Sequence, residues 1–205
     1  MTSRYHAAGS EGEFEPGSDG SVLANKLGII SPDEMDELEL VLLDKLYTHV
    51  LGPEFPDRAL LVADLKRWHH QWLGNVYDWA GQERSVNLSK GDFAFAAAAQ
   101  ITKLLEAFEA NCLQHYTPCH EREREASPRA IAETHVELIL IHPFREGNGR
   151  LARLLADVMA VQAGYDPLDY SSWEADTERY FAAIQRGVSR DYEPMVELVC
   201  DALKG

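Results

Sequence analysis

The sequence predicts an all-α fold, a helical bundle that carries one small β-hairpin. Apolar residues recur at helical spacing along most of the chain, whereas only one stretch alternates apolar and polar residues. Hydrophobic residues make up 45% and charged residues 26% of the 205 residues, which is typical of a globular protein. A chain of this length buries a core without disulfides or metal. We therefore expect a single domain over residues 21–205, preceded by an arm.

The arm, residues 1–20, is rich in glycine, serine and acidic residues, so we expect it to be irregular or extended. A first helix follows, with Ser31 as its N-cap and Pro32 in its first turn. The apolar stripe of this helix is predicted to consist of Leu38, Val41, Leu42 and Leu46.

A second helix is predicted over residues 60–76. In the stretch RSVNLSKG that comes later, Val86 and Leu88 alternate with polar residues, which is a strand signal. Because a lone strand has no partner, we expect a small hairpin closed on itself. A helix over residues 96–112 is predicted to follow it.

Two further helices flank the stretch HPFREGNGR, residues 142–150. The segment 128–142 begins after a Ser-Pro start signal and ends in ELILI, which is apolar on nearly every side and indicates a central buried helix. Apolar residues at helical spacing then continue over residues 151–162, up to a stop at Gly164. The loop between these two helices is the candidate functional site.

The start of the later helix is a candidate phosphate site. Gly147, Asn148 and Gly149 lie where a helix offers N–H groups and the positive end of its dipole, which together favour an anion. Arg150 and Arg153, three residues apart on one helix face, add charge for the outer phosphates.

Two titratable residues add chemistry to this loop. Glu146 would be repelled by bare phosphates, so its position indicates a magnesium ion between carboxylate and phosphate oxygens. His142, held at the end of a rigid helix, is a candidate general base for a hydroxyl that attacks phosphorus. Taken singly, a histidine at a helix end is usually packed or solvated, and Gly-Asn-Gly is usually a turn. Their combination favours a functional site.

The string from His142 to Arg153 matches in full the signature of the Fic domain, H-x-F-x-[DE]-G-N-G-R-x-x-R. The segments VLANKLGI, RSVNLSKGDFAFA and GVSRDYEPM also resemble bacterial Fic proteins, so the resemblance extends from about Tyr5 to Leu203. It implies a Fic-fold helical bundle with a β-hairpin flap next to the active-site loop. It also implies transfer of AMP from ATP onto a protein hydroxyl, with release of pyrophosphate.

The resemblance assigns roles to single residues. His142 would be the catalytic base, Glu146 the ligand of Mg²⁺, and Phe144 the anchor of the loop in the core. The nucleotide-binding residues would be Gly147, Asn148, Gly149, Arg150 and Arg153 in the motif, Lys90 and Gly91 in the flap, and Tyr180 in the adenine pocket.

The flap implies a docking mode for the target protein. An exposed hairpin edge can pair with an extended segment by strand addition, which positions a hydroxyl with little demand on sequence. The alternative is a solvated hairpin without a partner. Compact bacterial Fic toxins resemble enzymes that modify type II topoisomerase subunits, so such a subunit is one candidate target.

Many Fic proteins carry an inhibitory helix, [ST]-x-x-x-E-[GN], whose glutamate pairs with the second arginine of the motif, here Arg153. The two near matches in this chain end in Glu193 followed by Pro194, and in Glu106 followed by Ala107. The resemblance therefore implies the toxin of a toxin–antitoxin pair, in which a separate small helical antitoxin supplies the inhibitory glutamate.

The charge balance argues against nucleic acid or an anionic membrane as the main partner, because 34 acidic side chains face 19 basic ones and the net charge is −15. No stretch approaches the roughly 18 apolar residues of a membrane span, and the N-terminus does not resemble a secretory signal. Three cysteines without a C-x-x-C pair fit a reducing compartment. We therefore expect a cytoplasmic protein.

Three alternative readings stay open. Cys112, His115, Cys119 and His120 form C-x2-H-x3-C-H, a spacing that fits no common zinc site, so zinc is the minor interpretation. The Fic fold can also transfer other phosphate-containing groups, or serve as an idle binding module. Retention of both His142 and Glu146 counts against the idle module.

Overall fold

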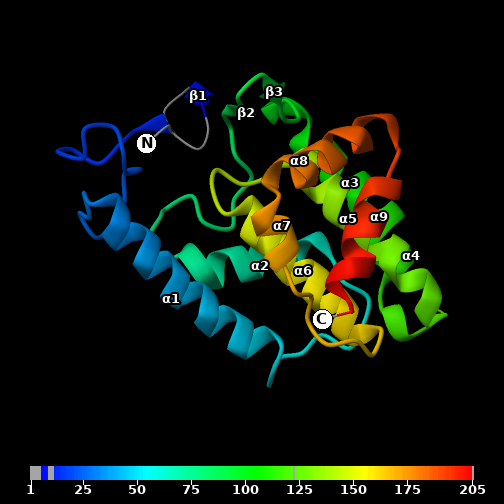
Figure 1. Ribbon diagram of the computed structural model, residues 1–205. Coiled ribbons are helices and arrows are strands. Elements are labelled where there is room, and N and C mark those ends of the chain that lie inside the picture. The colour runs from blue at the N-terminus through cyan, green and yellow to red at the C-terminus, as the bar shows by residue number, and fades with distance from the viewer. Residues whose placement is uncertain (1–5, 9–11, 122, 205) are drawn as a thin grey trace.

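The structure is a computed structural model of the chain and describes residues 6–8, 12–121 and 123–204. Its described residues form a helical bundle with a small sheet at one end (Figure 1). The longer elements are α1 (Pro32–Val50), α2 (Val62–Leu73), α3 (Ile101–Phe108), α5 (Ser127–Ile141), α6 (Asn148–Gln162), α8 (Thr177–Arg186) and α9 (Glu193–Ala202). The shorter ones are β1 (His6–Ala8), β2 (Asn87–Lys90), β3 (Phe93–Ala94), α4 (Gln114–Tyr116) and α7 (Ser171–Ala175).

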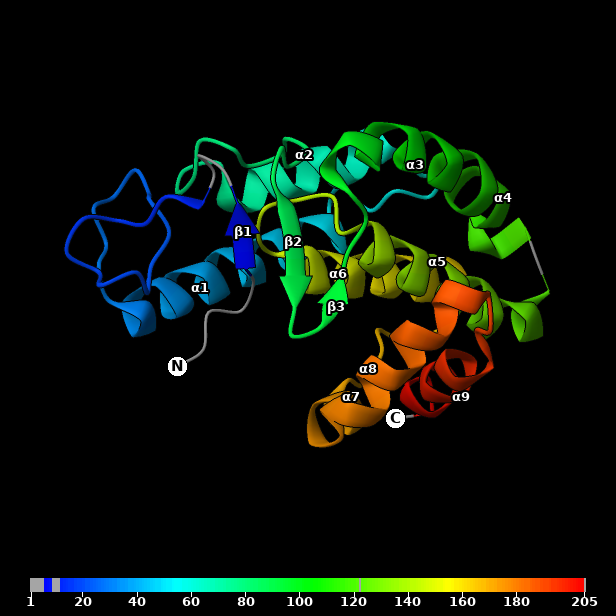
Figure 2. The same cartoon turned by 90° about the horizontal axis from the view of Figure 1, so that it is seen from above.

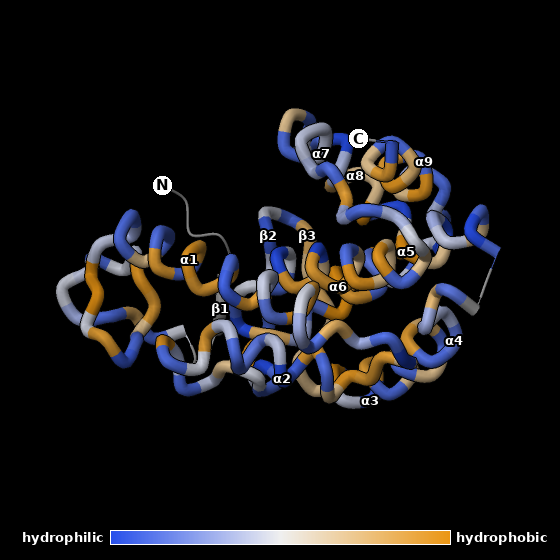
Figure 3. The backbone as a smooth tube through the Cα atoms, turned by 90° about the horizontal axis from the view of Figure 1, so that it is seen from below, coloured by the Kyte–Doolittle hydropathy of each residue, from blue (hydrophilic) through white to orange (hydrophobic). Residues whose placement is uncertain are grey.

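Helix α5 lies at the centre of the bundle and packs against α3, α6, α8 and α9. The prediction of a central buried helix is therefore confirmed. Helix α5 ends at Ile141, directly before the motif loop. In Figure 3 much of α5 and of α6 is coloured hydrophobic, as expected for two helices that bury each other's apolar faces. The motif loop is thus held between two rigid elements. None of the described helices is both long and apolar enough to cross a bilayer.

Helix α1 begins as predicted, because the Ser31 side chain accepts a hydrogen bond from the Glu34 amide at 3.4 Å. Its predicted apolar stripe is wrong at Val41, which is 48% exposed. Leu46 is buried as predicted, and Leu38 and Leu42 pack against the core. The buried face of the helix also carries Met35, Glu39 and Val50. A carboxylate therefore occupies a core position of this helix.

Helix α2 is shorter than the predicted 60–76. At its start, the Leu60 amide donates to Thr117 Oγ1 at 2.7 Å, so Leu60 is fixed outside the helix. At its end, the amides of Val76 and Tyr77 both donate to the Leu73 carbonyl in a tight turn. The expected helix over 96–112 is divided in a similar way, into a 3₁₀ turn (Ala98–Gln100), α3 and a π-helical turn (Glu109–Leu113).

The predicted hairpin is confirmed as β2 and β3, which pair antiparallel with Lys90 opposite Phe93. The arm, predicted to be irregular or extended, contributes a third strand that was not predicted: β1 pairs antiparallel with β2, with Ala7 opposite Leu88. Figure 2 shows the three strands side by side in the order β1-β2-β3. The buried side chain of Leu88 explains why this strand alternates in sequence.

Candidate active site

The motif loop joins α5 to α6 through two residues in the left-handed backbone region. His142 caps α5 with φ 51° and donates its amide hydrogen to the Leu138 carbonyl at 2.9 Å. Gly147 precedes α6 with φ 81°, and a Cβ there would lie 2.6 Å from Trp72 Cζ3. Glycine is therefore required at position 147 by the backbone angle and by the close ring.

The side chain of Asn148 holds the loop closed. Its Oδ1 accepts from the Phe144 amide at 2.8 Å, and its Nδ2 donates to the Phe144 carbonyl at 2.7 Å. Phe144 is itself buried and stacks on His69, with ring centroids 4.1 Å apart. The side chains of Asn148 and Phe144 thus shape the loop, and Asn148 can serve a phosphate only through its backbone N–H.

His69, which the sequence interpretation missed, supports the loop from α2. Its Nδ1 accepts from the Gly81 amide at 2.8 Å, so the neutral ring carries its hydrogen on Nε2, which donates to the Glu146 carbonyl at 3.0 Å. Burial lowers the pKa of His69 to about 4 and keeps this tautomer uncharged at neutral pH.

Gly149 contrasts with Gly147. A Cβ at position 149 would meet no protein atom within 4 Å, and its backbone lies outside the region that favours glycine. The fold therefore does not require glycine at this point in the first turn of α6. A bare backbone at a helix N-terminus suits an anion that approaches closely.

Both motif arginines are paired with carboxylates and aromatic rings. Arg150 Nη2 lies 2.7 Å from Glu39 Oε2, and its guanidinium lies 4.6 Å from the centre of a Trp72 ring. Arg153 Nη1 lies 2.7 Å from Glu174 Oε1 on α7, and its guanidinium lies 4.9 Å from the Tyr170 ring. The two cations are held at the start of α6, as a phosphate site needs.

The Glu146 carboxylate lies in the same region, with its side chain 15% exposed. Its Oε1 accepts from the Gly147 amide at 3.0 Å and lies 3.6 Å from Arg150 Nη2. One partly exposed carboxylate beside the candidate phosphate site is a donor set that suits Mg²⁺, which takes its other ligands from phosphates and water.

One ring nitrogen of His142, Nε2, can act as a proton acceptor. Its Nδ1 contacts the Ile139 carbonyl at 3.2 Å, so the neutral ring with hydrogen on Nδ1 has its lone pair on Nε2. Burial lowers the pKa of His142 to about 3, and the positive charges of Arg84 and Lys90 add to this. The imidazole is therefore neutral near pH 7 and can accept a proton.

The flap is tied to the motif loop by Arg84, a buried residue that the sequence interpretation missed. Arg84 donates to the carbonyls of His142 at 2.7 Å and Ala96 at 2.6 Å, and its amide donates to the Pro143 carbonyl at 2.8 Å. No local pattern distinguishes this arginine from a solvated one, because most of its partners are backbone carbonyls of distant segments.

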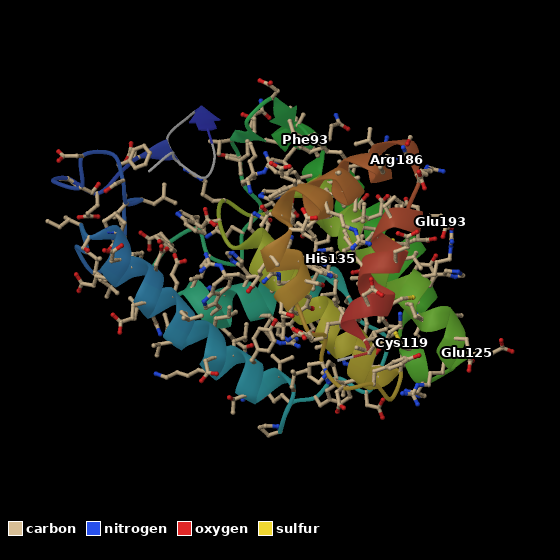
Figure 4. The ribbon with its side chains drawn as sticks, in the orientation of Figure 1. Phe93, Cys119, Glu125, His135, Arg186 and Glu193 are labelled. Atoms are coloured by element: carbon tan, nitrogen blue, oxygen red, sulfur yellow. The ribbon has the colours of Figure 1, made fainter. Side chains whose placement is uncertain are left out.

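The predicted flap residues lie at the turn of the hairpin, where Gly91 has φ 58°. Lys90 Nζ lies 3.7 Å above the ring of Phe181 on α8, so the flap reaches across to that helix. Tyr180 is buried: its hydroxyl lies 2.9 Å from His135 Nε2 and its ring stacks on Trp173. Figure 4 shows His135 in the interior of the bundle. The contact of Tyr180 with adenine stays a prediction.

The Cys/His pattern is dispersed among structural contacts. Cys119 Sγ donates to the Tyr116 carbonyl at 3.3 Å, and His120 Nδ1 lies 3.0 Å from Asp57. Within residues 6–8, 12–121 and 123–204, no three His, Cys, Asp or Glu side chains are grouped to hold a metal ion. Zinc binding by this pattern therefore gains no support from the structure.

The near match at Glu193 does not reach the motif. Its carboxylate pairs with Arg129 at the start of α5, and Figure 4 shows it on the outer side of the bundle. The carboxylate that does contact Arg153 belongs to Glu174, within the stretch SSWEA, which lacks the inhibitory pattern.

The chain resembles known proteins over most of its length. The sequence pattern of the Fic/DOC family matches residues 59–160. A probable protein adenylyltransferase of Sinorhizobium fredii is 30% identical over 174 residues, covering 85% of this chain and 87% of that protein. The probable protein adenylyltransferase Fic of Escherichia coli is 30% identical over 179 residues, covering 86% of this chain and 84% of that protein. The N-terminal Fic domain of a VirB-translocated effector from Bartonella quintana, solved with bound ADP, is 26% identical with a TM-score of 0.71, and the match covers 92% of each chain.

Proposed function

The chain belongs to the Fic/DOC family and is a protein adenylyltransferase, and we propose that its α5–α6 loop transfers AMP from ATP to a hydroxyl of a target protein. The observation that carries the proposal is the arrangement of the loop. A neutral histidine stands at one end, and an open helix N-terminus with Arg150 and Arg153 at the other.

The transfer step divides between the two ends of the loop. Nε2 of His142 takes the proton from the attacking hydroxyl, whose oxygen forms a bond to the α-phosphorus of ATP. The bond from that phosphorus to the bridging oxygen breaks, and pyrophosphate leaves with its electron pair. The N–H groups of Asn148 and Gly149 and the guanidinium groups of Arg150 and Arg153 stabilise the phosphate oxygens, while the Gly147 N–H holds the Glu146 carboxylate.

Glu146 would hold Mg²⁺ against the phosphates, since the chemistry of its partly exposed carboxylate fits this ion. The ion, when bound, would neutralise charge on the phosphate oxygens. The hydrogen bond from the Gly147 amide orients the carboxylate toward the start of α6.

The flap would present the target. Strand addition to the hairpin supplies backbone hydrogen bonds and requires little of the target's sequence. In the structure, β1 pairs with one edge of β2. A target strand therefore either adds to the β3 side or displaces β1.

The biological role is a further part of the proposal. We assign residues 21–205 to one catalytic domain, because α9 packs on α5 and α1 packs on α2, which in turn packs on α6. The enzyme would act in the cytoplasm as a toxin, with a protein target such as a type II topoisomerase subunit. A small helical antitoxin would supply a glutamate to Arg153.

The experiment compares two labels. Purified chain, magnesium and a cell lysate are incubated with ATP labelled at either the α- or the γ-phosphorus. AMP transfer predicts a labelled protein with the α label alone. Labelling by the γ label would indicate phosphoryl transfer and contradict the proposal, and excision of the labelled band identifies the target.

A further inference from the structure

A buried carboxylate on α1 contacts the phosphate site from outside the motif. Glu39 is 3% exposed. Its Oε2 accepts from Arg150 Nη2 at 2.7 Å, and its Oε1 accepts from the Tyr77 hydroxyl at 2.8 Å. Burying a carboxylate is costly unless it is paired and hydrogen-bonded, and both of its oxygens meet this condition.

Trp72 completes the support beneath Arg150. Its Nε1 donates to the Glu39 backbone carbonyl at 2.9 Å, and its ring lies 4.6 Å from the Arg150 guanidinium. The same ring limits position 147 to glycine. We call Glu39, Trp72 and Tyr77 the arginine platform, because they fix Arg150 from α1, α2 and the turn that follows α2.

The platform explains why a charged residue occupies the core face of α1. An arginine side chain has large rotamer freedom, and ordering it at the moment of binding weakens affinity. The hydrogen bond to Glu39 and the stacking on Trp72 fix the guanidinium before a ligand arrives. The Arg150 guanidinium has five N–H donors, and Glu39 accepts a hydrogen bond from only one of them, so the others can donate to phosphate oxygens.

We infer that Glu39 is a positioning residue of the nucleotide site, which orients Arg150 for the phosphates of ATP and is itself oriented by Tyr77. This inference rests on the proposed phosphate contact of Arg150. Because Arg150 holds phosphates in the bound ATP and in the transition state alike, loss of its orientation should raise KM for ATP and leave kcat nearly unchanged.

The experiment is a double-mutant cycle on the full chain. The variants are Glu39→Gln, Arg150→Lys and the two together, with Glu37→Gln as control, because Glu37 is exposed on the same helix. KM and kcat for ATP are measured with the α label, the dissociation constant of ATP by calorimetry, and folding by thermal unfolding.

We expect Glu39→Gln to raise KM for ATP about 5- to 30-fold, with kcat within about threefold of the parent. In the Arg150→Lys background the same change should have less than about a twofold effect, since its partner is already altered. Glu37→Gln should match the parent. An equal rise in KM in both backgrounds, or an unchanged KM in folded Glu39→Gln, would overturn the inference.

Tyr77→Phe gives an independent test if Glu39→Gln does not fold. It removes the hydroxyl that orients Glu39, so KM for ATP should rise a few-fold in the parent background and not with Arg150→Lys. A parent-like KM would count against the inference. If Arg150→Lys itself binds ATP as the parent does, the phosphate site is misassigned, and the failure belongs to the proposed function instead.

Discussion

The ring of Phe95, on the flap side of the site, stacks on the ring of His142 with centroids 3.8 Å apart and planes 19° apart. His142 is consequently only 2% exposed. In this arrangement the flap covers the proposed catalytic base, and a target hydroxyl reaches Nε2 only after Phe95 moves. Under the proposed docking of the target on the flap, movement of Phe95 would also change the burial, and hence the pKa, of His142.

The first prediction follows from this link. Burial holds the pKa of His142 at about 3, below its ordinary 6.5, so the base stays deprotonated in mild acid. Phe95→Ala exposes the ring and should move its pKa upward, and activity is lost as pH falls through that pKa. The acid limb of kcat/KM should therefore lie at higher pH in the variant. Superimposable pH profiles would contradict this.

The second prediction concerns stability in acid. Burial lowers the pKa of His69 and His135 to about 4, and that of His142 to about 3. Below pH 6.5 the unfolded chain binds these protons first, so the free energy of unfolding falls as pH falls. Asp157 opposes this, since burial raises its pKa to about 6 and the folded chain binds its proton first.

In this range the unfolded chain binds three more histidine protons than the folded chain, and the folded chain binds one more proton on Asp157. The net difference of two protons predicts that the free energy of unfolding falls by roughly 3 kcal/mol per pH unit between about pH 6 and pH 4. Urea unfolding at several pH values measures the slope. A free energy of unfolding that stays constant or rises as pH falls over this interval would contradict the low pKa values of the buried histidines.

The third prediction separates two glycines of the motif. Gly147→Ala forces a side chain into a left-handed backbone against Trp72, so it should destabilise the fold by about 1–3 kcal/mol. Gly149→Ala meets open space in a helix and should leave stability equal or up to about 1 kcal/mol higher, while its methyl group blocks the phosphates. Thermal unfolding and ATP calorimetry distinguish them. Unchanged ATP affinity in Gly149→Ala would place the phosphates elsewhere.

The fourth prediction concerns the ion pair of Arg153 with Glu174, whose side chain is 64% exposed. Water screens this pair, so Glu174→Gln should change stability by less than about 1 kcal/mol. Because the carboxylate competes with phosphate for Arg153, its removal should lower KM for ATP about two- to threefold, and less in high salt.

The control is Glu193→Gly. Because Glu193 pairs with Arg129 and not with Arg153, this variant should leave KM for ATP unchanged. A rise from no activity to full activity in either variant would show that inhibition is internal and argue against a separate antitoxin.

The sequence predicts the elements that follow a local rule. Helix α5 and the loop are predicted because hydrophobic periodicity and the motif are continuous in the chain. The third strand is not predicted, because the sequence of β1 does not alternate apolar and polar residues. It forms a strand by pairing with β2, where Ala7 lies opposite Leu88. Val41 is misplaced because spacing alone does not say which apolar residue faces inward.

The residues that support the site were mostly not predicted from the sequence. Glu39 lies four residues after Met35 on the buried face, so a carboxylate at a core position was a signal in the sequence. Arg84 and His69 carry no such signal, since their partners are backbone carbonyls and amides that the fold brings from distant segments. Motif residues are recognised by sequence, whereas the residues that hold them depend on tertiary structure.

The most direct test of the account is the rate of AMP transfer by His142→Ala, measured with α-labelled ATP and the identified target beside the parent and an exposed control, His120→Ala. The base contributes only to the attack of the hydroxyl, so the account predicts a rate lower by roughly 10² to 10⁴, with ATP affinity within about twofold of the parent and full activity in the control. Transfer by His142→Ala at the parental rate would contradict the assignment of His142 as the base.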